Sequence, residues 1–327
     1  MTGERELLAE TVRALVNKHG GPAAVREAME SPRGYDESLW KMLCEQVGAA
    51  ALVVPEVFGG AAGELADAAT VLRELGRGLV PTPLLGTTLA ELALLAGDPV
   101  DADTVGRLVE GTAIGAVVFA DQRSREQQPR WDYVVNGDVA DVVVGVENGQ
   151  LSRWDQFTAR RVDTMDPTRR LARLQPRQTT PIGSDPGLAH IAAILLAAEQ
   201  IGAAERCLEL TVDYTKSRVQ FGRPIGSFQA LKHRMADLYV AVSAARAVVD
   251  DALADPSPTA AALARVTATE AFGKVAAEGI QMHGGIAITW EHDMQLYFKR
   301  AHGSAHLFGP VRDHTRRLES EVLNNEA

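Results

Sequence analysis

Residues 188–218 have the sequence LAHIAAILLAAEQIGAAERCLELTVDYTKSR, and this stretch decides the fold class. Gly202 is the one helix breaker within it, so a single helix of roughly 45 Å is predicted at about 1.5 Å per residue. Further helices are predicted over 228–253, 259–281, 291–304 and 310–323, with a break at the DPSP of 255–258. Long helices joined by short connections predict a helix bundle over residues 184–327.

The region before this bundle has a different texture. Short valine-rich segments, such as AIGAVVFA (113–120) and ADVVVGV (140–146), alternate with Gly and Asn between residues 113 and 183. This pattern is typical of strands and turns. Because the region has only about 70 residues, we expect a small, compact antiparallel sheet.

Residues 1–112 show helical periodicity instead. Apolar residues recur every three or four positions near the start, and Gly20-Gly21-Pro22 ends that first segment. Further helices are expected over 37–48, 63–79 and 85–97. The sequence therefore predicts an α+β, mostly α chain with a helical domain (1–112), a reduced middle β-domain (113–183) and a C-terminal helical bundle (184–327).

Charge and length narrow the classes of partner. The 327 residues include 33 basic and 43 acidic side chains, a net charge of −10, which argues against nucleic acid or an anionic membrane as the main partner. Cys44 and Cys207 form no CxxC, so a disulfide framework or thiolate zinc site is not expected and a reducing cytoplasm fits. The charged start MTGERELLAE is unlike a signal peptide, and no apolar run reaches about 18 residues. We expect a cytoplasmic protein.

Common catalytic motifs are absent from the sequence. It has no GxGxxG after a strand, no HExxH and no GxSxG, and Gly273-Lys274 is followed by Val275 rather than by the Ser or Thr of a P-loop. Four histidines gather between residues 283 and 306, without a carboxylate at metal-ligand spacing. Packed or solvated histidines explain them best, so no metal site is predicted.

Two segments of the bundle carry the candidate chemistry. Arg218-Val-Gln-Phe221-Gly222 follows the long helix, with Gln229 near the start of the next one, and Gln281-Met-His-Gly-Gly285 ends another helix. An arginine fork beside glycines and loop amides suits a pyrophosphate. The spacing alone also fits a structural Gly-Gly helix cap, with Phe221 in the core and Gln229 as a polar helix start.

These segments resemble the acyl-CoA dehydrogenase family, and the resemblance extends to both ends of the chain in matching order. The segments that carry it are LWKMLCEQVGAAALVVPEVFGG (39–60), RELGRGLVPTPLL (73–85), DPTRRLARL (166–174), SRVQFGRPIGSFQALKHRMADLYV (217–240) and IQMHGGIAITWEHDMQLYFKRA (280–301). The resemblance implies an N-terminal helical domain, a middle β-domain that is truncated here, and a C-terminal four-helix bundle.

The family resemblance also implies FAD at a subunit interface, where one chain reaches the adenosine diphosphate half of its neighbour's cofactor. The cofactor-binding residues so implied are Arg218, Phe221, Gln229, Gln281, Met282, His283, Gly284 and Gly285. Such enzymes oxidise an acyl-CoA to the 2-enoyl-CoA: a glutamate removes the α-proton while hydride passes from the β-carbon to the flavin.

That glutamate is missing from this chain. Its two family positions fall on Gly309 and on Ala192, so no catalytic residue is predicted. Glu199 lies about two turns beyond Ala192 and is a weak substitute, and Glu291 belongs to a structural segment. The middle domain also departs from the family, because Phe119-Ala-Asp-Gln122 leads directly into RSREQQPRWDY without the Thr-Glu…Gly-Ser-Asp segment that faces the flavin.

Loss of the groups that act within a subunit, with retention of those that reach a neighbour, predicts a subunit of a heteromeric acyl-CoA dehydrogenase. The expected partner is a full-length acyl-CoA dehydrogenase chain in an α2β2 assembly. FAD would be shared at the interface, the complex would act on an acyl-CoA, which a steroid side-chain thioester would fit, and an electron-transfer flavoprotein would accept the electrons. Two alternatives stay open: a homomeric flavoenzyme with a different base, and a non-enzymatic CoA-ester-binding or scaffold protein.

Overall fold

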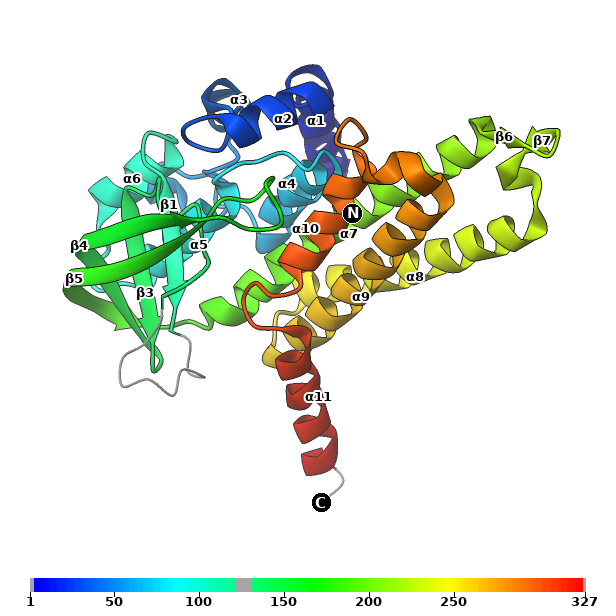
Figure 1. Ribbon diagram of the computed structural model, residues 1–327. Helices are drawn as coiled ribbons and strands as arrows, with labels where there is room; N and C mark the ends of the chain where they lie inside the picture. Colours follow the sequence, from blue (N-terminus) through cyan, green and yellow to red (C-terminus); the bar gives the residue numbers. More distant parts are fainter. Residues whose placement is uncertain (1–2, 121–130, 326–327) are drawn as a thin grey trace. The chain divides into compact units, whose positions relative to one another are not determined.

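The computed structural model describes residues 3–120 and 131–325 and is mostly helical (Figure 1). It divides into two compact units, residues 1–71 with 80–192 and residues 72–79 with 193–327. The α+β, mostly helical class is confirmed. The predicted division into three domains stays a prediction, since its first two parts fall in one unit.

The first unit combines short helices with one sheet. Its helical elements are α1 (Gly3–His19), α2 (Pro22–Glu30), α3 (Glu37–Met42), η1 (Leu43–Val47), η2 (Glu56–Phe58), the first half of α4 (Leu65–Arg77), α5 (Leu84–Leu95) and α6 (Ala102–Val109). Local capping explains two of their starts. The Asp36 carboxylate accepts from the backbone N–H of Ser38 (2.8 Å), and Asp101 accepts from that of Thr104 (3.1 Å).

The sheet has five strands in the order β1-β3-β4-β5-β2. The strands are β1 (Gly115–Phe119), β2 (Val134–Val135), β3 (Val142–Glu147), β4 (Gln150–Val162) and β5 (Leu171–Ser184). The expectation of an antiparallel sheet is wrong for one pair, because β1 and β3 run parallel. Between β1 and β3 the chain forms β2 at the opposite edge of the sheet. This segment provides the long crossover connection that a parallel pair of strands needs.

The sheet core is aromatic and valine-rich. Trp131 and Trp154 meet edge to face, with 5.2 Å between ring centroids. Gly145 leaves room for this arrangement, because a Cβ there would lie 2.4 Å from the indole nitrogen of Trp154.

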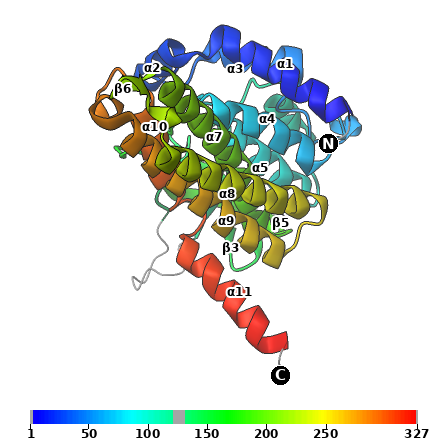
Figure 2. The ribbon, with the colours of Figure 1, turned by 90° about the vertical axis from the view of Figure 1, so that its right-hand side faces the viewer.

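The second unit is the predicted helical bundle. Its elements are α7 (Leu188–Ser217), the hairpin β6 (Val219–Gln220) and β7 (Arg223–Pro224), η3 (Ile225–Ser227), α8 (Gln229–Ala254), α9 (Pro258–His283), η4 (Gly284–Ile288), α10 (Met294–Ser304) and α11 (Val311–Asn325). Helices α8 and α9 lie side by side (Figures 1 and 2), and α9 also packs against α10 and α11. The hairpin joins the ends of α7 and α8 at one tip of the bundle (Figure 1).

The last turns of α4 belong to this second unit because they approach α7 very closely. A Cβ on Gly202 would lie 1.9 Å from the carbonyl oxygen of Arg73, and a Cβ on Gly76 would lie 2.2 Å from that of Glu199. Arg77 then bonds Glu209 on α7 (2.8 Å). Two glycines therefore permit a crossing that ion pairs hold in place.

One helix among the described residues, α7, is long and apolar enough to cross a membrane by length and composition. Most of its apolar stretch is buried within the structure. A buried core helix of a folded unit can have the same length and apolar composition.

Candidate functional site

The first candidate segment follows the end of α7 and includes the tip of the hairpin. The backbone N–H of Arg218 donates to the carbonyl of Tyr214 (2.8 Å), and Ile225 N–H donates to the carbonyl of Arg218 (2.8 Å). Phe221 (φ 54°) and Gly222 (φ 77°) form the turn, as in a type I′ hairpin. Asn and Gly favour such positions, so an aromatic residue there carries a conformational cost of order 1–3 kcal/mol.

The side chains of this segment point to solvent. Phe221 is 92% exposed, so it is not a core residue of this chain. Its ring meets that of Phe228 edge to face (6.3 Å between centroids), and the Arg223 guanidinium lies 4.1 Å over the Phe228 ring. An exposed phenyl ring held at a fixed turn is suited to contact a planar group from another molecule.

Arg218 and Gln229 are also exposed. Neither side chain has a hydrogen bond or ion pair with the residues that the structure describes, and Gln229 stands at the first position of α8. This region therefore offers the Arg218 guanidinium and the Gln229 amide, which no described side chain or backbone group engages.

The second candidate segment is the end of α9. Gly284 has φ 68° and ψ −149°, a conformation reserved almost entirely for glycine, and its N–H donates to the carbonyl of Ile280. Gln281, Gly284 and Gly285 are exposed, and a Cβ on either glycine would meet no atom within 4 Å. The backbone at these two glycines is thus open to close approach by another molecule.

Two predicted residues of this segment face inward instead. Met282 and His283 are each 6% exposed. His283 Nδ1 lies 2.7 Å from the carbonyl of Gly279, so that nitrogen carries the proton. Burial lowers the pKa of His283, and His292 lowers it further.

Tyr214 joins the two segments and was not singled out by the sequence. Its ring stacks on His283 (4.2 Å, interplanar angle 23°), and its hydroxyl donates to the His283 carbonyl (3.2 Å). Its own carbonyl accepts from Arg218 N–H. One turn separates Tyr214 from Arg218, a helix spacing that could have drawn attention to it.

The two positions expected for a catalytic carboxylate hold none. Ala192 is fully buried in α7. Gly309 has φ 93°, follows Phe308 at φ 53°, and a Cβ there would lie 3.3 Å from His314 Nε2. A glutamate at residue 309 would thus have a strained backbone conformation, and its Cβ would lie close to the His314 ring.

The loop before Gly309 is fixed by a buried cation. Arg265 is fully buried, and its guanidinium donates to the carbonyls of Ser304 (2.5 Å) and Leu307 (3.0 Å). Glu199, the weak substitute base, is itself buried and ion-paired with buried Arg300. A carboxylate held by an arginine is a poor proton acceptor, because the cation stabilises its ionised form.

A buried acid in the first unit was missed by the sequence analysis. Glu91 on α5 is fully buried, and neither carboxylate oxygen has a hydrogen-bond partner among the described residues. Burial raises its pKa well above the ordinary value. Thr88, one turn earlier, has a buried hydroxyl in the same situation.

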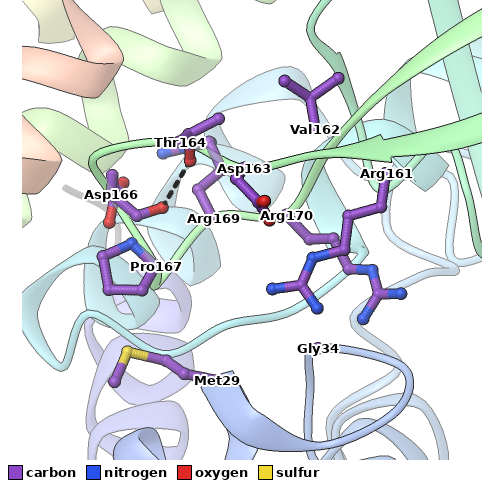
Figure 3. A pocket seen from close by; sticks show the side chains of 10 residues that line it. All are labelled: Met29, Gly34, Arg161, Val162, Asp163, Thr164, Asp166, Pro167, Arg169 and Arg170. Carbon is purple, nitrogen blue, oxygen red and sulfur yellow. Dashed lines mark hydrogen bonds between the residues drawn. The ribbon is translucent and has the colours of Figure 1, made fainter.

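Figure 3 shows a small polar pocket of the first unit, about 70 Å³, beside Gly34. Arg170 donates to Asp138 (2.7 Å) and to the carbonyl of Pro32 (2.7 Å), and Asp166 accepts from the backbone of Thr168 (3.0 Å). The Asp138 carboxylate therefore offsets the Arg170 guanidinium, and the pocket carries no functional assignment. The charged residues that line it are Arg161, Arg169, Arg170, Asp163 and Asp166.

The expected loss of the flavin-facing segment falls on residues 121–130, which lie outside the described residues. Within the described ranges, no group of three or more His, Cys, Asp and Glu side chains could hold a metal ion.

Comparisons with known proteins decide the family. The model of the acyl-CoA dehydrogenase N-terminal domain matches residues 2–98, and that of the acyl-CoA dehydrogenase C-terminal domain matches residues 187–311. The chain belongs to the acyl-CoA dehydrogenase family. The chain is 69% identical to acyl-CoA dehydrogenase IpdE2 of Mycobacterium tuberculosis. The match covers 98% of this chain and 97% of that relative.

Two further comparisons agree. The chain is 63% identical to acyl-CoA dehydrogenase IpdE2 of Mycolicibacterium smegmatis, over 99% of its own length and 100% of the relative's. Among solved structures it is similar to a chain of the ChsE4-ChsE5 complex from Mycobacterium tuberculosis, with a TM-score of 0.89, 26% identity, and coverage of 99% and 98%. The sequence-based identification of the family is confirmed.

Proposed function

We propose that this chain is a base-lacking subunit of a heteromeric, FAD-dependent acyl-CoA dehydrogenase, and that it completes the cofactor site of a partner chain. The observation that carries the proposal is a contrast. The side chains of Arg218, Gln229 and Gln281 are exposed and make no hydrogen bond or ion pair with the described residues, whereas Ala192 and Gly309 stand where a base would be.

The exposed residues fit the adenosine diphosphate half of FAD. Arg218 would hold the pyrophosphate through its planar fork, with Gln229 and Gln281 as amide donors. The open space at Gly284 and Gly285 would admit the phosphates against the backbone, and Phe221 would contact the adenine face. Met282 and His283 would support this surface from within, since both are buried.

When bound, FAD supplies the hydride acceptor for oxidation of the acyl-CoA. The residues of this chain would bind and orient the cofactor, and the partner would supply the carboxylate that removes the α-proton. We infer a full-length acyl-CoA dehydrogenase chain as partner, in an α2β2 assembly, and an electron-transfer flavoprotein as the electron acceptor in the cytoplasm. The similar ChsE4-ChsE5 structure is itself a complex of two differently named chains, which supports a heteromer.

The acyl group is proposed by class alone. The names of the similar chains include a steroid acyl-CoA dehydrogenase, at 24% identity and a TM-score of 0.86, which shares the fold. A steroid side-chain CoA thioester is therefore the first substrate class to test on the complex.

The decisive experiment compares the chain alone with the chain co-expressed and co-purified with a full-length acyl-CoA dehydrogenase. We expect flavin bleaching by acyl-CoA only in the complex, because the lone chain has no base. Stoichiometric FAD in the lone chain that acyl-CoA reduces would overturn the proposal in favour of a homomeric flavoenzyme. A partnerless chain without FAD would favour a binding or scaffold protein.

A further inference from the structure

The two exposed segments proposed to reach the dinucleotide lie far apart in sequence. One is the hairpin at Arg218–Gly222, and the other is the turn at Gln281–Gly285. The position of the amide and guanidinium donors relative to one another depends on how these segments are joined. Tyr214 of α7 forms one joint between them, because it bonds to both.

The backbone of Tyr214 fixes the hairpin. Its carbonyl oxygen accepts from the backbone N–H of Arg218 (2.8 Å) and from the hydroxyl of Ser217 (3.0 Å). The first of these bonds closes the last turn of α7, so the direction in which the chain leaves the helix is tied to this residue.

The side chain of Tyr214 fixes the other segment. Its hydroxyl donates to the carbonyl of His283 (3.2 Å), the last residue of α9, and its ring lies parallel to the His283 imidazole (4.2 Å between centroids). The next residue is Gly284, whose unusual backbone conformation starts the exposed turn. Tyr214 thus holds the carbonyl immediately before the first glycine.

A second histidine also contacts the His283 ring. His292 meets His283 edge-on (4.9 Å), and its Nδ1 accepts from the backbone N–H of Met294 (3.1 Å) at the start of α10. His283 donates from Nδ1 to Gly279, and His292 accepts at Nδ1, so the two rings carry their protons on different nitrogens. The stack Tyr214–His283–His292 therefore connects α7, α9 and the start of α10.

We propose that Tyr214 is a positioning residue for dinucleotide recognition: it sets the spacing between the Arg218 hairpin and the Gly284–Gly285 turn without touching the cofactor. The inference rests on the proposed function, because it supposes that both segments contact FAD. A preorganised site lowers the ordering cost of binding, so loosening the joint weakens binding even when every contact residue is present.

The test measures FAD affinity in the complex of the full chain with its partner. Tyr214→Phe keeps the stack and removes one hydrogen bond, and roughly two- to tenfold weaker FAD binding is expected. Tyr214→Leu also removes the stack, and a loss of roughly ten- to a hundredfold is expected. FAD titration followed by flavin fluorescence gives both values.

The matched control is Tyr297→Phe. Tyr297 is a buried tyrosine of the same unit whose hydroxyl also donates to a backbone carbonyl, that of Arg77 (2.5 Å). This hydrogen bond involves neither residues 218–222 nor residues 281–285. Its loss should lower thermal stability about as much as Tyr214→Phe does and leave FAD affinity unchanged, which separates positioning from general stability.

A second readout needs no cofactor. In the chain alone, Tyr214→Phe should increase amide hydrogen exchange at both residues 218–222 and residues 281–285, and Tyr297→Phe should increase it at neither. Increased exchange across the whole bundle in Tyr214→Phe would contradict a local joint.

The outcomes separate the two proposals. A wild-type complex that binds no FAD contradicts the proposed function and the positioning role together. A wild-type complex that binds FAD, with unchanged affinity in Tyr214→Phe and Tyr214→Leu, contradicts the positioning role alone. If Tyr214→Leu does not fold, the conservative Tyr214→Phe variant decides the question by affinity and exchange.

Discussion

Among single residues, Glu91 is the clearest case of chemistry that the sequence pattern does not display. A glutamate in the apolar helix 84–95 looks like a surface position, yet the structure buries it completely, and no residue in the described part of the chain forms a hydrogen bond with its carboxylate. Its raised pKa means that the folded protein holds the proton more tightly than the unfolded chain. The stability that this proton contributes is present below the ordinary pKa and is lost as pH rises toward the folded value.

The prediction is that Glu91→Met raises the free energy of unfolding by about 1–3 kcal/mol at pH 8 and by less at pH 5, because a desolvated acid is replaced by an apolar group. Urea unfolding at the two pH values measures the difference. Glu10→Met, on an exposed position of α1, is the control and should change stability little. Equal stability of wild type and Glu91→Met at pH 8 would contradict the account.

A second residue-level prediction concerns Arg218. Hydrogen bonds to charged groups contribute about 1.5–3 kcal/mol, so Arg218→Ala should weaken FAD retention in the complex by roughly ten- to a hundredfold with the fold intact. Lys216→Ala removes a neighbouring positive charge, one that pairs with Asp213, and should change FAD retention little. Full flavin content in purified Arg218→Ala complex would count against the assignment.

At the scale of elements, the crossing of α4 and α7 is a very close contact between helices. Gly202→Ala would place a methyl group 1.9 Å from the carbonyl oxygen of Arg73, so the helices must separate and the overpacking should cost about 1–3 kcal/mol. Gly273→Ala on α9 is the matched control: it meets nothing within 4 Å and should stabilise the helix by about 0.5–1 kcal/mol. Thermal unfolding of both variants checks this, and a stabilised Gly202→Ala protein would refute it.

The long helices were predictable because each lacks internal breakers. The predicted 188–218, 228–253 and 259–281 agree closely with α7, α8 and α9. Helix α2 was missed because Pro22 ends one helix and also stands at the first turn of the next, where proline is tolerated.

Other features lay beyond sequence reasoning. The parallel β1–β3 pair depends on the route of the chain through β2, which periodicity does not encode. The candidate site residues could be named from their segments, but the inward direction of Met282 and His283 depends on tertiary packing. The same holds for the stacking of Tyr214, which requires α9 to lie beside the end of α7.

At the scale of the whole molecule, the buried histidines of the second unit and the buried Glu91 of the first unit titrate in opposite senses. Burial lowers the pKa of His283 and His314 in the second unit, so folding favours their neutral forms. Their contribution to stability is present above the ordinary histidine value, about 6.5, and is lost as pH falls through the folded values. Glu91 in the first unit acts in the other direction.

The resulting prediction is that the second unit loosens first on acidification. Hydrogen exchange at pH 5 compared with pH 7.5 should show the larger loss of protection in residues 193–327. His314→Asn should reduce that acid sensitivity, because an amide in place of the imidazole has no proton to gain. Acid-induced opening confined to the first unit would contradict this assignment.

The central claim is that this chain contacts the FAD of a partner chain and has no complete flavin and catalytic site of its own. The most direct measurement is the number of FAD molecules per chain in the purified complex, from flavin absorbance and the mass of the assembly. The account predicts one FAD for each pair of unlike chains and none in this chain alone. Two FAD molecules per pair, one held by each chain, would contradict it.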